Sequence, residues 1–186
     1  MVPQLRFRHV GMLVRDIDRM AAFYKDILGF VETDRGIALG VMIVFLTRDP
    51  SAHHQLVLSS GLPEPSGATR ALQQLSFMVD SLDDLRQMYR NIWDRRDVSG
   101  LLPTDHGNAW SLYFRDPEQN RIEIYLDTPW HVAQPHHFDL DLSLSDSVIY
   151  RQTEQRVRAD PSFKPVQEWR REQLARLRAA GIRVPD

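Results

Sequence analysis

Apolar positions in the first part of the chain change from the spacing of a strand to that of a helix. Residues 8–14 read as a strand, and apolar side chains then recur at helical intervals over residues 17–27. Asp16 or Asp18 can cap this helix, and Gly29 provides a stop after it. The pattern therefore predicts a strand followed by a helix that ends at about residue 28.

Strand-like segments follow this helix and are separated by turn residues. The second of them is apolar enough to be a central strand. A linker is expected next, because glycine and proline are frequent over residues 61–67. The three predicted strands are residues 30–33, 41–46 and 53–58, which completes a βαβββ module.

The same order of elements is repeated further along the chain. A strand at residues 75–79 leads through Ser81, whose run to Asp84 is an acidic capping box, into a helix that reaches Ile92. Three more strands are predicted near residues 98–102, 110–114 and 122–126, of which the first has the weakest pattern. A second βαβββ module is therefore expected, and repeated element order indicates a duplicated fold.

The repeat and the remaining segments divide the chain into four parts. The expected organisation is a first module at 1–62, a linker at 63–70, a second module at 71–128 and a helical extension at 129–186. Helices are expected in the extension at residues 145–159 and 165–180, because the composition there favours helix. The extension lies outside the repeat, so we interpret it as a covering or dimer-packing arm. The predicted fold class is α+β.

Composition excludes several classes of function. The chain has 186 residues, a formal net charge of −2 and no cysteine, which excludes disulfide scaffolds and thiolate sites. Its basic residues are not separated from acidic ones, so a nucleic-acid partner is not expected. The sequence also shows no signal peptide and no membrane-spanning run. We therefore expect a cytoplasmic protein with no membrane partner.

Twin positions in the two modules indicate a metal site. His9 and Gln74 open equivalent strands, 65 positions apart, and Glu123 lies in the last strand of the second module. An unpaired buried carboxylate would be costly at Glu123, and a divalent metal would offset that cost. The alternatives are a buried arginine partner for Glu123 and a backbone-bonded structural histidine at His9. Convergence of the three side chains on one cavity would give a divalent-metal site.

Paired βαβββ modules with His9, Glu123 and the run from Ser111 to Glu123, which contains Asp116-Pro117, resemble the vicinal oxygen chelate superfamily. That superfamily includes glyoxalase I, bleomycin-resistance proteins, methylmalonyl-CoA epimerase and extradiol catechol dioxygenases. The resemblance covers about residues 6–128 and is specific in its second half. It implies a curved, half-open barrel around a metal ion.

Within that superfamily the chain looks most like the catalytic half of an extradiol dioxygenase. The resemblance assigns the metal ligands to His9, Gln74 and Glu123, with glutamine standing where the family has a histidine. A facial set of two histidines and one carboxylate suits Fe(II) and leaves positions for substrate and oxygen. An amide makes a harder site, as in glyoxalase I, for which Mn, Ni, Zn or Mg would serve.

The resemblance also implies catalytic positions. His54 would be the acid–base, and Tyr113 and His106 would bind the substrate. His53 and His54 are adjacent in a predicted strand and should point to opposite faces, with His54 inward. A shift of one residue would place Gln55 inward instead. Tyr113 could also be an ordinary half-buried aromatic, and His106 an ordinary loop residue.

The resulting functional prediction is a metal-dependent enzyme with a small-molecule aromatic or vicinal-oxygen substrate. An Fe(II) extradiol dioxygenase is the first expectation. The alternatives are a glyoxalase-like lyase or isomerase with a Lewis-acid metal, and a metal-free binding protein similar to bleomycin-resistance proteins. A homodimer is expected from the resemblance alone.

Overall fold

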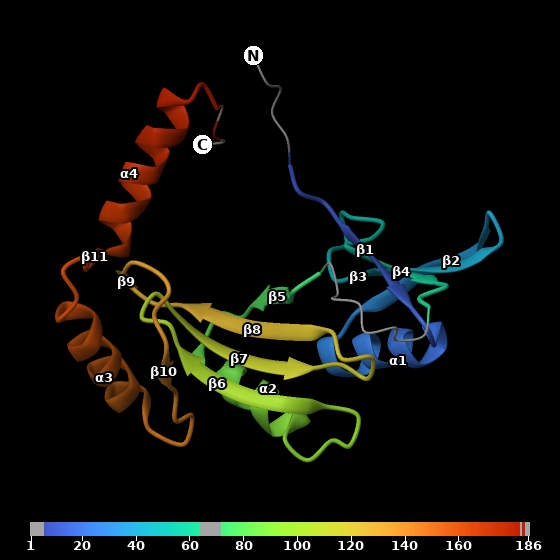
Figure 1. The fold of residues 1–186 in the computed structure, drawn as a ribbon, viewed down its shortest axis with the longest axis horizontal. Coiled ribbons are helices and arrows are strands. Elements are labelled where there is room, and N and C mark those ends of the chain that lie inside the picture. The colour runs from blue at the N-terminus through green and yellow to red at the C-terminus, as the bar shows by residue number, and fades with distance from the viewer. Residues whose placement is uncertain (1–5, 64–71, 183, 185–186) are drawn as a thin grey trace.

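The computed structural model of the protein describes residues 6–63, 72–182 and 184. Two β-sheets, each with an associated helix, make up most of the molecule, and further helices follow at the C-terminal end (Figure 1). The linker expected at 63–70 falls outside the described residues, except for Pro63.

The first module has the predicted βαβββ order. Its strands form one sheet in the order β1-β4-β3-β2, in which β1 is parallel to β4 and the other pairs are antiparallel. β1 is therefore an edge strand. The elements are β1 (Val10–Val14), α1 (Ile17–Leu28), β2 (Val31–Ala38), β3 (Val41–Thr47) and β4 (Leu56–Ser60).

Both ends of α1 are fixed by the residues that the sequence indicates. The Asp16 carboxylate accepts a hydrogen bond from the backbone N–H of Arg19 at 3.0 Å. Gly29 adopts φ +65°, the left-handed conformation that favours glycine at a helix end. The buried face of α1 includes Met20, Phe23 and Ile27, so the predicted helix is confirmed.

The second module repeats this order within a five-stranded sheet. Its strand order is β10-β6-β7-β8-β5, so β5 is an edge strand like β1. The segment with the weakest sequence pattern is a full strand, β6. The elements are β5 (Leu75–Met78), α2 (Leu82–Ile92), β6 (Ser99–Asp105), β7 (Ala109–Arg115) and β8 (Arg121–Asp127).

The two faces of the second sheet differ in character. Leu112 and Phe114 of β7 and Ile122 and Ile124 of β8 are buried on one face. Because neighbouring residues of a strand point to opposite faces, Tyr113 and Glu123 lie on the other face. This second face is the polar face of the sheet.

The turn between β7 and β8 joins the two modules. Glu118 Oε1 accepts hydrogen bonds from the backbone N–H groups of Arg15 and Asp16, both at 2.8 Å, at the start of α1. The buried Asp116 carboxylate accepts a hydrogen bond from the Tyr24 hydroxyl at 3.1 Å. A helix N-terminus attracts negative charge, so the turn fixes α1 of the first module to the second sheet.

The C-terminal extension packs against the second module. Thr153 of α3 donates a hydrogen bond to the buried Asp105 carboxylate and accepts one from the indole N–H of Trp110, both at 2.8 Å. The extension contains β9 (Trp130–His131), β10 (Phe138–Asp139), α3 (Asp146–Arg158), β11 (Lys164–Pro165) and α4 (Val166–Ala179). Both predicted helices are confirmed.

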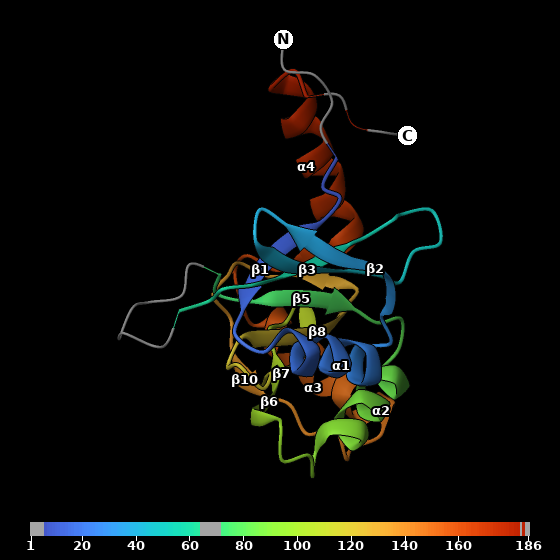
Figure 2. The same cartoon turned by 90° about the vertical axis from the view of Figure 1, so that its right-hand side faces the viewer.

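α4 differs from the other helices, because it has no buried residue. It projects from the molecule at the end opposite to α1 and α2 (Figure 2). Its contact with the rest of the chain includes the stacked rings of His131 and Trp169, whose centroids are 4.9 Å apart.

The α+β prediction with two βαβββ modules is confirmed. The strands of the described residues form separate sheets and do not close into a barrel. Within the described chain, no helix combines the length and apolar character needed to cross a membrane.

Candidate functional site

The Glu123 carboxylate is the centre of a hydrogen-bond cluster on the polar face. In the strand register, Glu123 pairs with Ser76 of β5 and with Tyr113 of β7. Its Oε2 accepts from Gln74 Nε2 at 2.9 Å and from Ser76 Oγ at 2.5 Å. Its Oε1 accepts from Ser111 Oγ at 2.9 Å and from Tyr113 Oη at 2.6 Å. A carboxylate has about four acceptor positions, so all of them are occupied.

A line of hydrogen bonds extends from this carboxylate to the backbone of the extension. Tyr113 Oη lies 2.9 Å from His106 Nε2, and His106 Nδ1 lies 2.8 Å from the carbonyl oxygen of His136. The line begins and ends on acceptors and therefore needs three protons. Tyr113 and a neutral His106 supply only two. The line consequently has room for one further proton.

Tyr113 is the residue of this line with a displaced pKa. Burial, followed by its hydrogen bond to Glu123 and the charge of that carboxylate, raises the pKa of Tyr113 to about 12. Arg121 lies over the tyrosine ring, with its guanidinium carbon 4.0 Å from the ring centroid. The hydroxyl is thus held as a neutral donor beside a carboxylate.

A second cluster, of histidines, lies on the first module. The rings of His9 and His54 are 4.4 Å apart, and His54 also contacts Phe45 at 5.1 Å. His53 Nδ1 lies 2.9 Å from His54 Nδ1, and His53 Nε2 lies 2.8 Å from the Asp34 carboxylate. Burial and, after it, the neighbouring histidines lower the pKa of His54.

The prediction that His53 and His54 point to opposite faces is wrong. β4 begins at Leu56, so both histidines precede the strand and strand alternation does not apply to them. They contact each other, and both contact Phe45. Gln55 does not replace His54, because its side-chain oxygen accepts a hydrogen bond from the backbone N–H of Arg48 at 2.9 Å.

The structure brings two of the three predicted metal ligands into contact. Gln74 and Glu123 meet at 2.9 Å, whereas His9 contacts His54 of its own module. In the described part of the chain, no group of three or more His, Cys, Asp or Glu side chains is arranged to hold a metal. A set in which an amide replaces a histidine contains only two such side chains. Convergence of all three ligands remains a prediction.

The donors at Glu123 define how a metal ion would fit. Gln74 contributes an amide, whose oxygen and nitrogen exchange places on rotation, and Glu123 contributes a carboxylate. Together they provide oxygen ligands of the kind that hard divalent cations take. A metal ion at Oε2 would have to replace the hydrogen bond from Gln74 Nε2 or that from Ser76.

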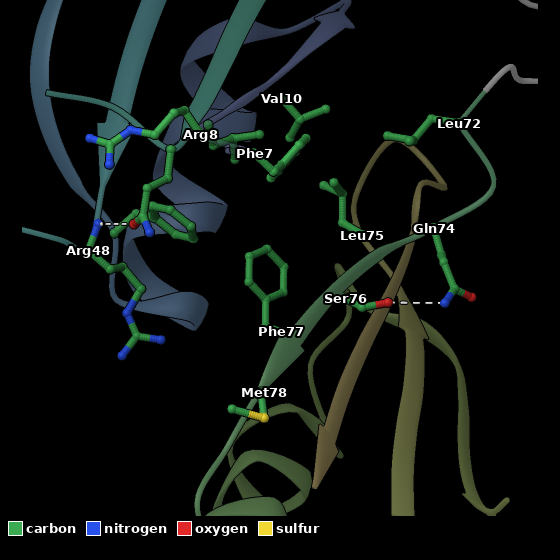
Figure 3. Close-up of a pocket in the computed structure, with 13 residues that line it drawn as sticks. Phe7, Arg8, Val10, Arg48, Leu72, Gln74, Leu75, Ser76, Phe77 and Met78 are labelled. Carbon is green, nitrogen blue, oxygen red and sulfur yellow. Dashed lines mark hydrogen bonds between the residues drawn. The ribbon is translucent and has the colours of Figure 1, made fainter. Parts of the chain in front are cut away.

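An open cleft of about 840 Å³ lies between the two modules (Figure 3). β1 and β5 line it, and each is the edge strand of its sheet. The rings of Phe30 and Phe77 contact each other across the modules at 5.8 Å. Gln74 and Ser76 lie on the side of β5 away from Phe77. The cleft therefore reaches the Gln74 end of the Glu123 cluster.

Ser76 and Ser111 are site residues that the sequence-based prediction missed. Each lies two positions from a predicted residue, Ser76 from Gln74 and Ser111 from Tyr113. Residues two apart in a strand share a face, so this spacing could have identified them.

Known proteins are similar to this chain over its two modules. The family model of the Glyoxalase/Bleomycin resistance protein/Dioxygenase superfamily matches residues 6–124. Biphenyl-2,3-diol 1,2-dioxygenase 3 of Rhodococcus globerulus is 32% identical over 126 residues, which are 66% of this chain and 63% of that protein. Biphenyl-2,3-diol 1,2-dioxygenase 2 of the same organism is 26% identical over 125 residues, with the same coverage. This chain therefore spans 63% of the length of these relatives.

Solved structures give the same fold. A glyoxylase/bleomycin resistance protein/dioxygenase domain from Frankia sp. aligns with a TM-score of 0.50 and 26% identity, over 64% of this chain and 95% of that domain. A glyoxalase family protein from Bacillus cereus aligns with a TM-score of 0.52 and 17% identity, over 68% of this chain and 96% of that protein. At that identity, the second likeness concerns the fold alone.

Proposed function

Because this chain belongs to the glyoxalase, bleomycin resistance protein and dioxygenase superfamily, we propose that it is an extradiol-type dioxygenase that opens the ring of a catechol-like aromatic molecule. The observation that carries the proposal is the His106–Tyr113–Glu123 line on one face of the second sheet. The 32% identity to a biphenyl-2,3-diol dioxygenase supports the same substrate class.

Glu123 and Gln74 would hold the metal ion, and His9 would be the third ligand. Fe(II) is the expected ion, because a mononuclear site with open positions suits oxygen chemistry. When bound, the ion supplies a centre at which a catecholate and dioxygen exchange electron density.

The side chains of the polar face bind and orient the diol. Tyr113 Oη and His106 Nε2 are 2.9 Å apart, so one hydroxyl of a bound diol can reach both atoms. The line between Glu123 and the His136 carbonyl has room for one further proton, and a proton released from the diol would be held there. His54 would serve as acid–base through Nε2, since its Nδ1 lies against His53.

A metal-free binding protein is the second candidate, and the state of Glu123 favours it. Four donors already satisfy this carboxylate, so its burial needs no metal ion. The same polar face would then bind the aromatic diol without converting it. A Lewis-acid lyase or isomerase is favoured by the oxygen donors of Gln74 and Glu123, which suit Mn(II) or Mg(II).

The first test measures metal content and oxygen consumption. Protein purified without chelator is expected to hold one divalent metal per chain, and anaerobic loading with Fe(II) should give oxygen uptake with a catechol. Elemental analysis and an oxygen electrode provide the measurements. Metal binding without oxygen uptake across a catechol panel would favour the Lewis-acid enzyme. Failure to bind Fe(II), Mn(II) or Zn(II) would leave the binding protein.

Two substitutions separate the roles within the site. Glu123→Ala removes a ligand and should abolish metal binding, whereas Tyr113→Phe should keep the metal and reduce turnover by about 10²-fold or more. Tyr113→Phe is the matched control, because its hydroxyl contacts the same carboxylate. Equal loss of metal in both variants would show that Tyr113 acts by positioning Glu123.

A further inference from the structure

Two arginines face each other at the turn end of the β7–β8 hairpin. Arg115 is the direct cross-strand partner of Arg121. Like charges directly opposite each other destabilise a sheet. Among the described residues, neither arginine forms an ion pair with a carboxylate, although many other arginines do. Positive charge is therefore concentrated here in a chain whose net charge is −2.

The contacts of these arginines leave much of each guanidinium available. Arg115 donates one hydrogen bond, from Nη1 to the backbone oxygen of Gln119 at 3.0 Å. Arg121 lies over the Tyr113 ring at 4.0 Å, a cation–π contact that uses the face of the guanidinium and leaves its edge free. A guanidinium edge is suited to bidentate binding of a carboxylate.

Both arginines line a cavity of about 250 Å³ that also includes Tyr113. Gly100 forms part of the wall with φ +65°, and a Cβ at this position would lie 3.7 Å from the Arg115 side chain. Leu102 supplies an apolar wall and is 41% exposed. The cavity thus combines an aromatic ring, an apolar surface and two positive charges.

The cavity adjoins the proposed diol site. Arg121 and Glu123 are two residues apart on β8 and share a face, which corresponds to about 7 Å along the strand. Tyr113 belongs to both places, since its hydroxyl binds Glu123 and its ring carries Arg121. A single aromatic ring can therefore lie beside Tyr113 with its diol toward Glu123 and its far end toward the arginines.

We propose that Arg115 and Arg121 bind an acidic substituent of the ligand, so that the substrate class is a catechol-like aromatic carrying a carboxylate. The orientation of the diol rests on the proposed function. The anion subsite rests on the arginine pair and its cavity. The paired charges account for the like-charge contact across the hairpin, because a bound carboxylate neutralises it.

Calorimetric titration of the whole chain tests this subsite. The ligands are catechol, 3,4-dihydroxybenzoate and benzoate, measured in low and moderate salt. The wild type should bind 3,4-dihydroxybenzoate about tenfold or more tightly than catechol, as expected for charged hydrogen bonds. Moderate salt should weaken binding of the acid and leave that of catechol nearly unchanged.

The variants Arg121→Gln, Arg115→Gln and the double variant should reduce that preference to about twofold or less while catechol still binds. Arg151→Gln is the matched control, because Arg151 is exposed on α3 and lies outside this cavity. Circular dichroism establishes that each variant is folded.

The outcomes separate the two proposals. Equal affinity of the wild type for catechol and 3,4-dihydroxybenzoate would overturn the anion subsite and leave the diol site standing. A preference for the acid that survives in the double variant would also overturn it. Binding of benzoate that is lost in the double variant, with no binding of catechol, would support the subsite and overturn the proposed function. Absence of binding by all three ligands would overturn both.

Discussion

At the scale of single residues, Tyr113 links the chemistry of the site to its stability. Its folded-state pKa of about 12 is raised above the ordinary value of 10.0. The protonated hydroxyl is therefore favoured in the folded state, and its stabilising contribution is complete below pH 10. That contribution is lost as the pH rises from 10 through 12.

Tyr113→Phe should therefore flatten the alkaline part of the stability profile. Between pH 10 and 12 the wild type should lose more free energy of unfolding than the variant does. Urea unfolding at steps of pH measures this difference, and ultraviolet absorbance of phenolate reports the titration itself. Tyr24 and Tyr125 also have raised pKa values, but they are common to both proteins. Parallel profiles would show that Tyr113 does not titrate in this range.

The sequence predicts these residues only where a repeat or an alternation constrains them. Positions in repeated strands predict that Gln74 and Glu123 share one cluster, and the structure confirms their contact. The predicted orientation of His53 and His54 is wrong, because the start of β4 depends on its pairing with β1 and β3. Whether His9 reaches Glu123 depends on how the modules meet, which residue spacing does not encode.

At the scale of elements, the β7–β8 turn has a structural role that its sequence does not reveal. The run from Asp116 to Asn120 contributes to the family resemblance, yet its carboxylates are not directed at the Glu123 cluster. Asp116 accepts hydrogen bonds from the backbone N–H groups of Glu118 and Asn120, and Glu118 accepts those at the start of α1. The turn is therefore a joint between the modules.

Removal of this joint should destabilise the protein. Glu118→Ala leaves two backbone N–H groups at the start of α1 without their charged acceptor, which should cost about 1.5–3 kcal/mol. Glu154→Ala is the control, because Glu154 forms an exposed ion pair with Arg158 within α3 and should cost about 1 kcal/mol or less. Urea unfolding compares the two. Similar losses in both variants would mean that the joint does not stabilise the fold.

Helix ends are predicted better than strand ends, for a physical reason. A cap is a local interaction, so Asp16, Gly29 and Ser81 can be identified from neighbouring residues alone. β2 continues to Ala38, beyond the expected residue 33, because its pairing with β3 extends a polar segment that has no strand pattern. Strand length is set by the partner strand.

At the scale of the whole molecule, the relation between the modules depends on contacts that are distant in sequence. Tyr24 and Asp116 are 92 residues apart, and Phe30 meets Phe77. Such pairs carry no periodic signal, so the sequence predicts two modules without their relative placement. The homodimer remains a prediction, which light scattering on the purified protein can check.

The extension provides the last prediction, because its two helices are held differently. α3 covers Trp110 and satisfies the buried Asp105, through Thr153 and through Arg156 at 3.1 Å. A chain that ends after residue 128 would expose this tryptophan and leave the carboxylate without those partners. It should therefore aggregate or unfold without cooperativity.

A chain that ends after residue 163 is the matched control, because it lacks only β11, α4 and the residues that follow them. α4 has no buried residue, so its removal should cost little beyond the contact between His131 and Trp169. The far-ultraviolet circular dichroism of both shortened chains, followed during heating, compares them with the full chain. We expect the chain that ends at residue 163 to melt cooperatively and the chain that ends at residue 128 not to do so. Cooperative melting of both would show that the second module does not depend on α3, and loss of cooperativity in both would give α4 a structural role that its exposure does not predict.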